Sequence, residues 1–215
     1  MSVITVNHVD KYFGKIKVLS DVNAEFESGK IYGIIGRNGS GKTVLFKSIC
    51  GLMPISSGNI EIDGKTIGKD IDIPDNIGII IENPGFLNQF SAYDNLKYLA
   101  RIRGRIGKKE IVEVLKKVGL EDTGKKKVKK FSMGMRQRLG IAQAIMEDPE
   151  ILILDEPMNG LDKHGVEDIR QILLELREQG KLILLASHNS EDISQLCQEV
   201  YEMDAGILVK RKVSG

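Results

Sequence analysis

The residues best suited to chemistry form one glycine-rich stretch, Gly36-Arg37-Asn38-Gly39-Ser40-Gly41-Lys42-Thr43. It fits the pattern G-x-x-x-x-G-K-[ST], in which glycines let backbone N–H groups fold closely around an anion. In such a loop the lysine contacts the β- and γ-phosphates of a nucleotide, and the final hydroxyl is a ligand of Mg²⁺. The residues expected to bind the nucleotide are Gly36, Asn38, Gly39, Ser40, Gly41, Lys42 and Thr43, and Thr43 is also expected to bind the metal.

The sequence on either side of this stretch supports the interpretation. Residues 31–35 are a short apolar run typical of a buried strand, and residues 44–50 predict a helix that ends at Gly51. A strand, a turn and a helix in this order would direct the positive end of the helix dipole at the phosphates. The alternative is a chance match in a chain with 23 glycines, which would leave the flanking strand and helix unexplained.

A second chemical feature is the apolar run of residues 151–154, which ends in Asp155 and Glu156. Ligands of open α/β sheets bind at the carboxyl edge of the strands, and carboxylates there suit Mg²⁺-assisted phosphoryl transfer. We expect Asp155 to hold the metal through its water shell and Glu156 to polarise the attacking water. The run 181–186 predicts another buried strand, which places His188 at the same edge. A lone histidine is usually structural, but this position favours contact with the γ-phosphate.

The composition suits a globular protein and excludes few partners. Of the 215 residues 41% are hydrophobic, and Lys plus Arg (31) nearly balances Asp plus Glu (30), so bulk charge does not favour nucleic acid. Cys50 and Cys197 lack metal-type spacing and are expected to be reduced cytosolic thiols. No apolar run approaches the roughly 18 residues of a membrane span, so a function at a membrane would need another chain to cross it.

The remaining periodicity predicts strands at both ends of the chain and helices in the middle. Further strands are expected at residues 3–6, 18–26, 58–63 and 77–81, and a hairpin is expected from 200–203 and 207–210. Capping-box spacing at Ser91 and Asp94 opens a helix through Ala100. Other helices are expected at 111–118, ended by Gly119, at 131–146, and from the cap Asp162 to Arg177.

Two surface features have alternative interpretations. The segment from Lys11 to Gly14 is predicted to be a loop, on which Phe13 can stack on a nucleotide base or simply pack at a strand end. Two basic clusters are interpreted as solvated surface, with contact to anionic lipid headgroups as the alternative. They comprise Arg101, Arg103, Arg105, Lys108 and Lys109, and Lys125, Lys126, Lys127, Lys129 and Lys130.

Taken in order, these motifs resemble the ATP-binding subunit of ABC transporters over essentially the whole chain. The resemblance rests on the glycine-rich stretch, residues 131–138 in place of the family's LSGGQ signature, the strand ending at Glu156, the loop 159–162 and His188. It implies an α/β fold: a P-loop NTPase (RecA-like) core with an N-terminal antiparallel β subdomain and an inserted α-helical subdomain. A single nucleotide-binding domain would span residues 1–215, with the core and β subdomain in 1–82 and 147–215 and the helical subdomain in about 83–146.

The resemblance also implies a mechanism and partners. Two subunits, identical or different, would pair head to tail so that the signature of one covers ATP bound to the other. Ser132 and the Gly134 N–H would cap the γ-phosphate, and Asp162 would join the ATP-binding set. The activity implied is Mg²⁺-dependent hydrolysis of ATP to ADP and phosphate, with Lys42, Glu156 and His188 catalytic. It would drive a separate membrane permease from the cytoplasmic face of the cell membrane, with no nucleic acid involved.

Three residues depart from the family pattern. Met133 and Met135 replace a glycine and the glutamine of the signature, and Glu82 stands where glutamine is usual. We expect Glu82 to lie near the metal and Glu156. Two carboxylates about 5 Å apart would repel by roughly 3 kcal/mol at an effective dielectric of 20, unless Mg²⁺ offsets this or Glu82 lies farther away.

Residues 81–85 and 132–138 look like the branch that serves bacitracin-type and lantibiotic-immunity exporters, which favours antimicrobial peptide or drug-like cargo. Two other functions compete with this prediction. A soluble ABC-type ATPase acting on ribosomes or DNA usually fuses two such domains or inserts long coiled coils, and no heptads are sustained here. A P-loop kinase would leave the signature helix unexplained.

Overall fold

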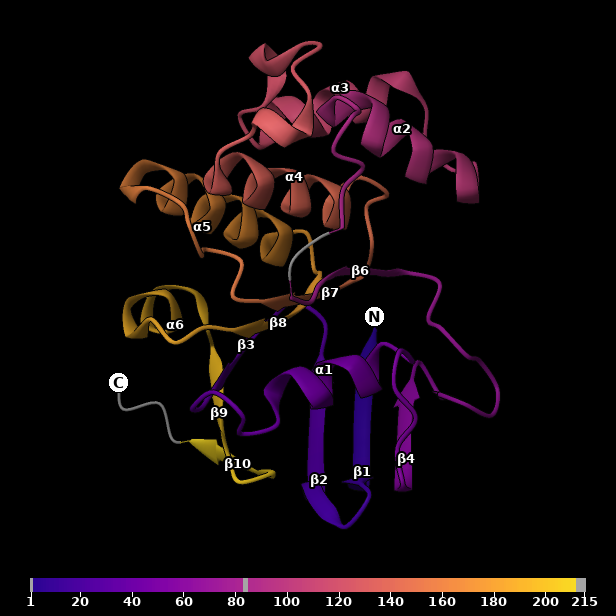
Figure 1. Cartoon of the computed structure of the whole chain (residues 1–215). Coiled ribbons are helices and arrows are strands. Elements are labelled where there is room, and N and C mark those ends of the chain that lie inside the picture. Colours follow the sequence, from indigo (N-terminus) through magenta and orange to yellow (C-terminus); the bar gives the residue numbers. More distant parts are fainter. Residues whose placement is uncertain (1, 83–84, 212–215) are drawn as a thin grey trace.

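The computed structural model describes residues 2–82 and 85–211, and a six-stranded sheet lies at its centre (Figure 1). The strand order is β10-β9-β3-β8-β7-β6. The bounds are β3 Ile31–Ile35, β6 Ile77–Ile80, β7 Ile151–Asp155, β8 Leu182–Ala186, β9 Glu199–Asp204 and β10 Ile207–Arg211. Neighbours from β9 to β6 run parallel, and β10 pairs with β9 antiparallel. The register pairs Asp155 with Ala186, so β7 and β8 end together at one edge.

A second sheet of four antiparallel strands has the order β2-β1-β4-β5. Its strands are β1 Val3–Phe13, β2 Ile16–Glu27, β4 Ser57–Ile62 and β5 Lys65–Thr66. Their inward side chains share one buried cluster with helix α1 (Lys42–Ile49) and with strands of the larger sheet. This cluster fixes the glycine-rich loop, which joins β3 to α1, between the two sheets.

The predicted loop from Lys11 to Gly14 is wrong for its first three residues, which continue β1 to Phe13. The register between β1 and β2 shifts between Val6 and Val9, where His8 adopts a φ of 49°. Such a bulge breaks the alternation of buried and exposed side chains, so the sequence pattern ended at Val6 although the strand does not.

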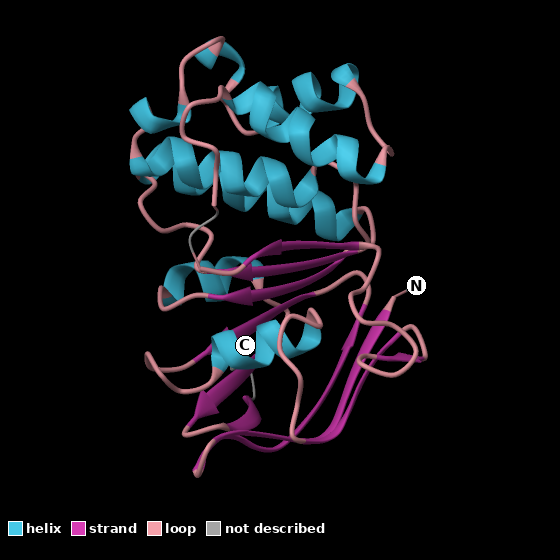
Figure 2. Ribbon diagram, turned by 45° about the vertical axis from the view of Figure 1, so that its right-hand side comes forward, coloured by secondary structure: helices cyan, strands magenta, loops and turns pink. Residues whose placement is uncertain are grey.

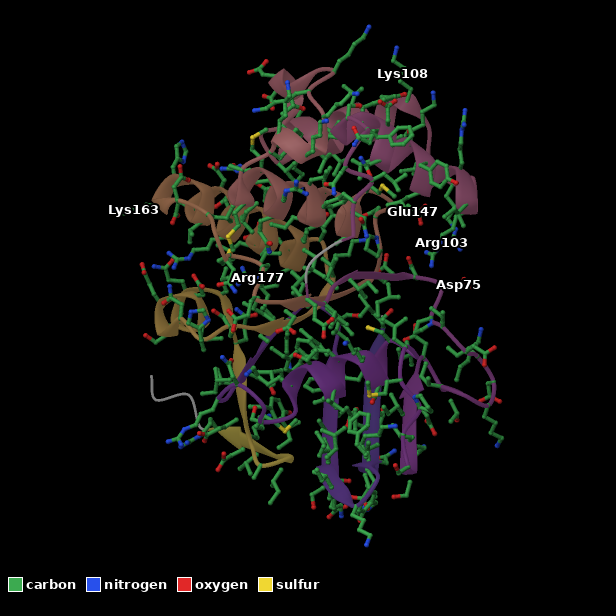
Figure 3. The ribbon with its side chains drawn as sticks, viewed as in Figure 1. Asp75, Arg103, Lys108, Glu147, Lys163 and Arg177 are labelled. Carbon is green, nitrogen blue, oxygen red and sulfur yellow. The ribbon has the colours of Figure 1, made fainter. Side chains whose placement is uncertain are left out.

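Helices between β6 and β7 form the far end of the molecule, across the six-stranded sheet from the smaller sheet (Figure 2). They are α2 Ala92–Arg103, α3 Lys108–Lys117 and α4 Met133–Ile145, with short 3-10 turns at 121–123 and 128–130. Ser91 caps α2 as predicted, because its Oγ accepts from Asp94 N at 3.1 Å. Arg103 connects this end to the rest of the chain: it donates to Asp75 O at 2.6 Å and to Glu147 Oε2 at 3.3 Å (Figure 3).

Two further helices follow β7 and β8. Helix α5 spans Lys163–Glu178 and α6 spans Ser190–Leu196. The cap predicted at Asp162 is confirmed, since its Oδ1 accepts from Gly165 N at 2.8 Å. The sequence did not predict α6, because seven residues are too few to show a helical period.

The expected fold class is confirmed: an α/β core, an N-terminal antiparallel sheet and helices inserted between β6 and β7. The division into subdomains stays a prediction. Its boundary at Asn83 lies outside the described residues, and α4 shares one hydrophobic cluster with β7 and β8.

Both basic clusters lie on the surface, as the first interpretation requires. The two cysteines are unpaired. Burial raises the pKa of the Cys50 thiol to about 12, and burial together with the charge of Asp192 does the same for Cys197. Both thiols are therefore protonated near neutral pH, in keeping with the expected reduced state.

Candidate nucleotide-binding site

The glycine-rich loop forms a cradle at the N-terminus of α1. Gly39 and Gly41 adopt φ of 78° and 116°, in the left-handed region that favours glycine. At Gly36 a Cβ atom would come within 2.2 Å of Met203 O on β9, so no larger residue fits there. The loop is thus held against β9 with its backbone turned around the space before α1.

Two polar side chains inside the cradle suit a phosphate group. Lys42 is 8% exposed, and its Nζ donates to Gly36 O at 2.7 Å and to Arg37 O at 3.2 Å. Ser40 Oγ is buried and has no hydrogen-bond partner within residues 2–82 and 85–211. A buried hydroxyl without a partner costs about 1–3 kcal/mol, so an oxyanion in the cradle would satisfy a group that the protein alone does not.

A cavity of about 570 Å³ opens in front of this cradle. One wall is the loop and the start of α1, and the opposite wall comes from the ends of β6 and β7, the first turns of α4 and the loop after β7. Its lining residues are Val18, Asn38, Gly39, Ser40, Gly41, Lys42, Thr43, Val44, Glu82, Met133, Gln137, Asp155, Glu156 and Asn159.

The predicted metal ligands Thr43 and Asp155 meet in this cavity. Thr43 Oγ1 donates to Asp155 Oδ2 at 2.8 Å and so joins α1 to the end of β7. Within residues 2–82 and 85–211 no three His, Cys, Asp or Glu side chains cluster as a metal site. This pair fits Mg²⁺, which commonly takes one or two protein oxygens and fills its octahedron with phosphate oxygens and water.

Glu156 and His188 lie together at the carboxyl edge, as predicted. Glu156 has a φ of 51°, and its N–H donates to Ala186 O at 2.9 Å, which extends the pairing of β7 with β8 by one residue. The His188 Nδ1–H donates to Glu156 Oε2 at 2.8 Å. His188 itself does not line the cavity and reaches it only through Glu156.

Glu82 lines the cavity but forms a salt bridge that the sequence analysis missed. Lys47 Nζ on α1 donates to Glu82 Oε1 at 2.6 Å. Lys47 follows Thr43 by four residues, and this helical spacing places both on one face of α1, so the spacing was the available signal. Lys47 therefore offsets part of the negative charge that Glu82 brings to the cavity.

Five cavity residues were not predicted to belong to the site: Val18, Val44, Met133, Gln137 and Asn159. Gln137 Nε2 donates to Pro157 O at 2.9 Å and to Glu156 O at 3.3 Å, which ties α4 to the end of β7. The Met133 side chain lies over Gly160, where a Cβ atom would come within 2.5 Å of Met133 Cγ. The methionine that replaces the signature glycine thus occupies the space that a side chain at position 160 would need.

The other predicted residues lie outside the cavity of a single chain. Ser132 Oγ accepts from Met135 N at 3.2 Å as the N-cap of α4, and Gly134 packs against Gly160 O. Asp162 caps α5. Phe13 is half exposed at the end of β1, with Lys11 Nζ 5.0 Å from its ring centroid.

Comparison with known proteins agrees with this geometry. The ABC transporter family model matches residues 19–159. Similar proteins include the uncharacterized ABC transporter ATP-binding protein YybJ of Bacillus subtilis, which is 44% identical over 96% of this chain and 94% of the relative. The bacitracin transport ATP-binding protein BcrA of Enterococcus faecalis is 40% identical over 97% and 68%. The lantibiotic transport ATP-binding protein SrtF of Streptococcus pyogenes is 36% identical over 99% and 92%.

Solved structures show the same fold. A bacterial ABC transporter cassette solved as a dimer superposes with a TM-score of 0.89 at 26% identity, over 99% of both chains. The same cassette in a dimeric post-hydrolysis state with ADP and phosphate gives 0.88 at 25% identity, again over 99% of each. Because the family model matches more than half of the chain and close relatives span nearly all of it, this chain belongs to the ABC transporter family and is an ATP-binding subunit.

Proposed function

We propose that this chain hydrolyses ATP with Mg²⁺ as one half of a head-to-tail pair, identical or different, and thereby drives a separate membrane permease. The observation that supports the proposal is that the start of α1 and the carboxyl ends of β7 and β8 lie together at the cavity. Lys42 and Thr43 begin α1, Asp155 and Glu156 lie at the end of β7, and His188, two residues after β8, contacts the cavity residue Glu156.

Each side chain has a distinct part in the proposed reaction. Lys42 and the N–H groups of the cradle bind the β- and γ-phosphates, while Thr43 and Asp155 would hold Mg²⁺. When bound, the metal supplies positive charge that stabilises the charge developing on the phosphate oxygens. Glu156 accepts a proton from the attacking water, and the Nδ1–H bond of His188 keeps the Glu156 carboxylate turned toward that water.

The signature residues are proposed to act on the nucleotide of the second subunit. Ser132 is exposed at the N-terminus of α4, and its position outside the cavity of its own chain fits this role. Asp162 and Phe13, which also lie outside, are proposed to contact nucleotide from the loop after β7 and from the end of β1. Similarity to a cassette solved as a dimer supports the paired arrangement.

The permease is proposed to bind beside Glu82 and the helical end. Large apolar side chains are exposed along the segment that follows Glu82, namely Leu87, Phe90, Tyr98 and Ile102, and Ile102 is 73% exposed. Contiguous exposed apolar surface is typical of a protein contact. No helix in the described ranges is long and apolar enough to cross a bilayer. We propose a location at the cytoplasmic face of a membrane, and the family relation supports this location.

The cargo is proposed to be an antimicrobial peptide or a drug-like molecule, moved outward. Support comes from two relatives whose names refer to bacitracin transport and lantibiotic transport. The cavity is assigned to the nucleotide, so none of its residues is assigned to the cargo.

The test is ATP hydrolysis by the complex that co-purifies with the chain from membranes. Lys42→Ala should lower turnover by about 100-fold or more, because a cation that contacts the transferred phosphate is lost. Lys69→Ala, a change at an exposed lysine outside the cavity, should leave turnover unchanged. Turnover in Lys42→Ala equal to that of the parent would rule out the assigned site.

A further inference from the structure

A buried ion pair lies behind His188, outside the nucleotide cavity. Arg170 on α5 and Asp192 on α6 are 5% and 1% exposed. Arg170 Nε and Nη2 both donate to Asp192 Oδ1, at 2.9 and 2.6 Å. The free-energy cost of burying two charges is rarely exceeded by their attraction. The pair is therefore weak evidence of stabilisation, and its further contacts indicate another role.

The second oxygen of the same carboxylate reaches the loop that carries His188. Ser187 is 3% exposed, and its Oγ donates to Asp192 Oδ2 at 3.1 Å. The same hydroxyl accepts from Asn189 N at 3.1 Å. The residues before and after His188 are therefore both held by one hydroxyl, which is held in turn by the buried pair.

His188 has little else to fix it. Its side chain is 71% exposed, and among the described residues its ring forms one hydrogen bond, the contact with Glu156. Few packing contacts reach an exposed ring, so the direction of the ring depends mainly on the backbone of residues 187–189. Hydrogen bonds that fix the groups around a catalytic side chain determine how well that side chain is oriented.

We infer that Asp192, oriented by Arg170, is a positioning residue that holds the loop 187–189 and thereby keeps His188 against Glu156. The inference rests on the role proposed above for His188. Arg170 also contacts Glu191 at 3.2 Å and Glu167 at 3.7 Å, both of which are exposed. The Glu191 contact joins α5 to α6 and the Glu167 contact lies within α5, and neither involves Ser187, so both provide matched controls.

The first measurement follows the His188 ring by NMR in histidine-labelled protein, which has only three histidines, His8, His164 and His188. Ser187→Ala keeps the Arg170–Asp192 pair but removes the link to the loop, so the His188 resonances should shift and broaden while those of His8 and His164 stay. Ser187→Cys, a weaker donor, should give a smaller change. Glu191→Gln and Glu167→Gln should leave all three unchanged.

Hydrolysis by the complex with the permease is measured on the same variants. Ser187→Ala should lower kcat by about 10-fold, since small misplacements of a catalytic group are costly, and KM for ATP should stay within about twofold. If the His188 resonances are unchanged in folded Ser187→Ala, the inference is wrong, whatever the turnover of that variant. Shifted His188 resonances support the inference. If the resonances shift but Ser187→Ala and His188→Ala both turn over ATP as fast as the parent, the proposed catalytic role of His188 is wrong.

Discussion

The salt bridge between Lys47 and Glu82 changes how the acidic side of the site can work. A carboxylate at position 82 adds negative charge to the cavity that Glu156 also lines, and Lys47, one helical turn after Thr43, offsets this charge in part. Glu82 and Lys47 are both partly exposed, so water screens their interaction and the pair contributes little to stability. The main effect of the pair is to set the net charge of this side of the cavity.

Glu82→Gln should weaken the apparent affinity for Mg²⁺, because the cavity loses a negative charge and Lys47 loses its partner. We expect the Mg²⁺ concentration that gives half-maximal hydrolysis to rise by roughly threefold, which corresponds to about 0.7 kcal/mol. Lys47→Met should shift that concentration in the opposite direction. Identical Mg²⁺ titrations of the parent and both variants would show that Glu82 does not act on the metal.

A functional residue could be predicted when a local sequence pattern marks its position. The glycine-rich loop, Asp155, Glu156 and His188 were found because each follows an apolar strand whose end is visible in the sequence. The contact of Gln137 with Pro157 O was not, since it joins residues from two elements and has no signature of its own. Lys47 falls between these cases.

At the scale of elements, one carboxylate links β9 to both of its neighbouring strands. Glu199, the first residue of β9, accepts from Lys30, just before β3, at 2.9 Å and contacts Lys210 on β10 at 2.7 Å. The bond with Lys210 lowers the pKa of Glu199, burial opposes this, and Lys30 adds to the lowering. One side chain thus joins three strands at the edge of the sheet where the chain ends its last hairpin.

This pKa predicts a pH-dependent stability. A carboxyl whose folded pKa is depressed stabilises the fold above its unfolded pKa, and the contribution is lost as pH falls through the folded value. The difference in unfolding free energy between the parent and Glu199→Gln should therefore be constant above about pH 5 and shrink below the ordinary value of 4.5. Urea titrations at pH 7, 5 and 3.5 measure it, and a difference that grows toward acid would contradict the assignment.

Helices and strands were predictable where the hydrophobic period of the sequence was unbroken. The parallel strands and α3, α4 and α5 appear near their expected places, while β1 was cut short at Val6 by the bulge around His8. The hairpin of β9 and β10 was expected, but nothing in its sequence shows that β9 also pairs with β3 in the core sheet. That pairing depends on segments more than 150 residues apart, which local periodicity does not reach.

In the proposed mechanism the whole molecule presents half of a working site. The cavity holds the groups proposed to bind phosphate and activate water, whereas Ser132 is exposed outside it. A head-to-tail pair would bring the signature of a second copy over the nucleotide. Because nucleotide would bridge the two copies, its binding should favour the pair by mass action.

Glu156→Gln should accumulate as this pair, since it keeps the shape of the site but removes the base that ends the ATP-bound state. Gel filtration with ATP and Mg²⁺ should show a dimer, and the double variant Lys42→Ala with Glu156→Gln should remain monomeric. The same variant is then examined in its complex with the permease. If it binds ATP there while its cassettes stay unpaired, the shared-site mechanism is contradicted.

Helix α5 connects the nucleotide cavity to the residues that hold the His188 loop. Its cap, Asp162, ends the loop whose Asn159 lines the cavity, and eight residues later Arg170 donates to Asp192. Sixteen residues make a rod of about 24 Å. If a second cassette contacts this loop in the proposed pair, a tilt of α5 would move Arg170 and, through Asp192, the loop that carries His188. Binding of the second cassette would then be coupled to the orientation of the histidine.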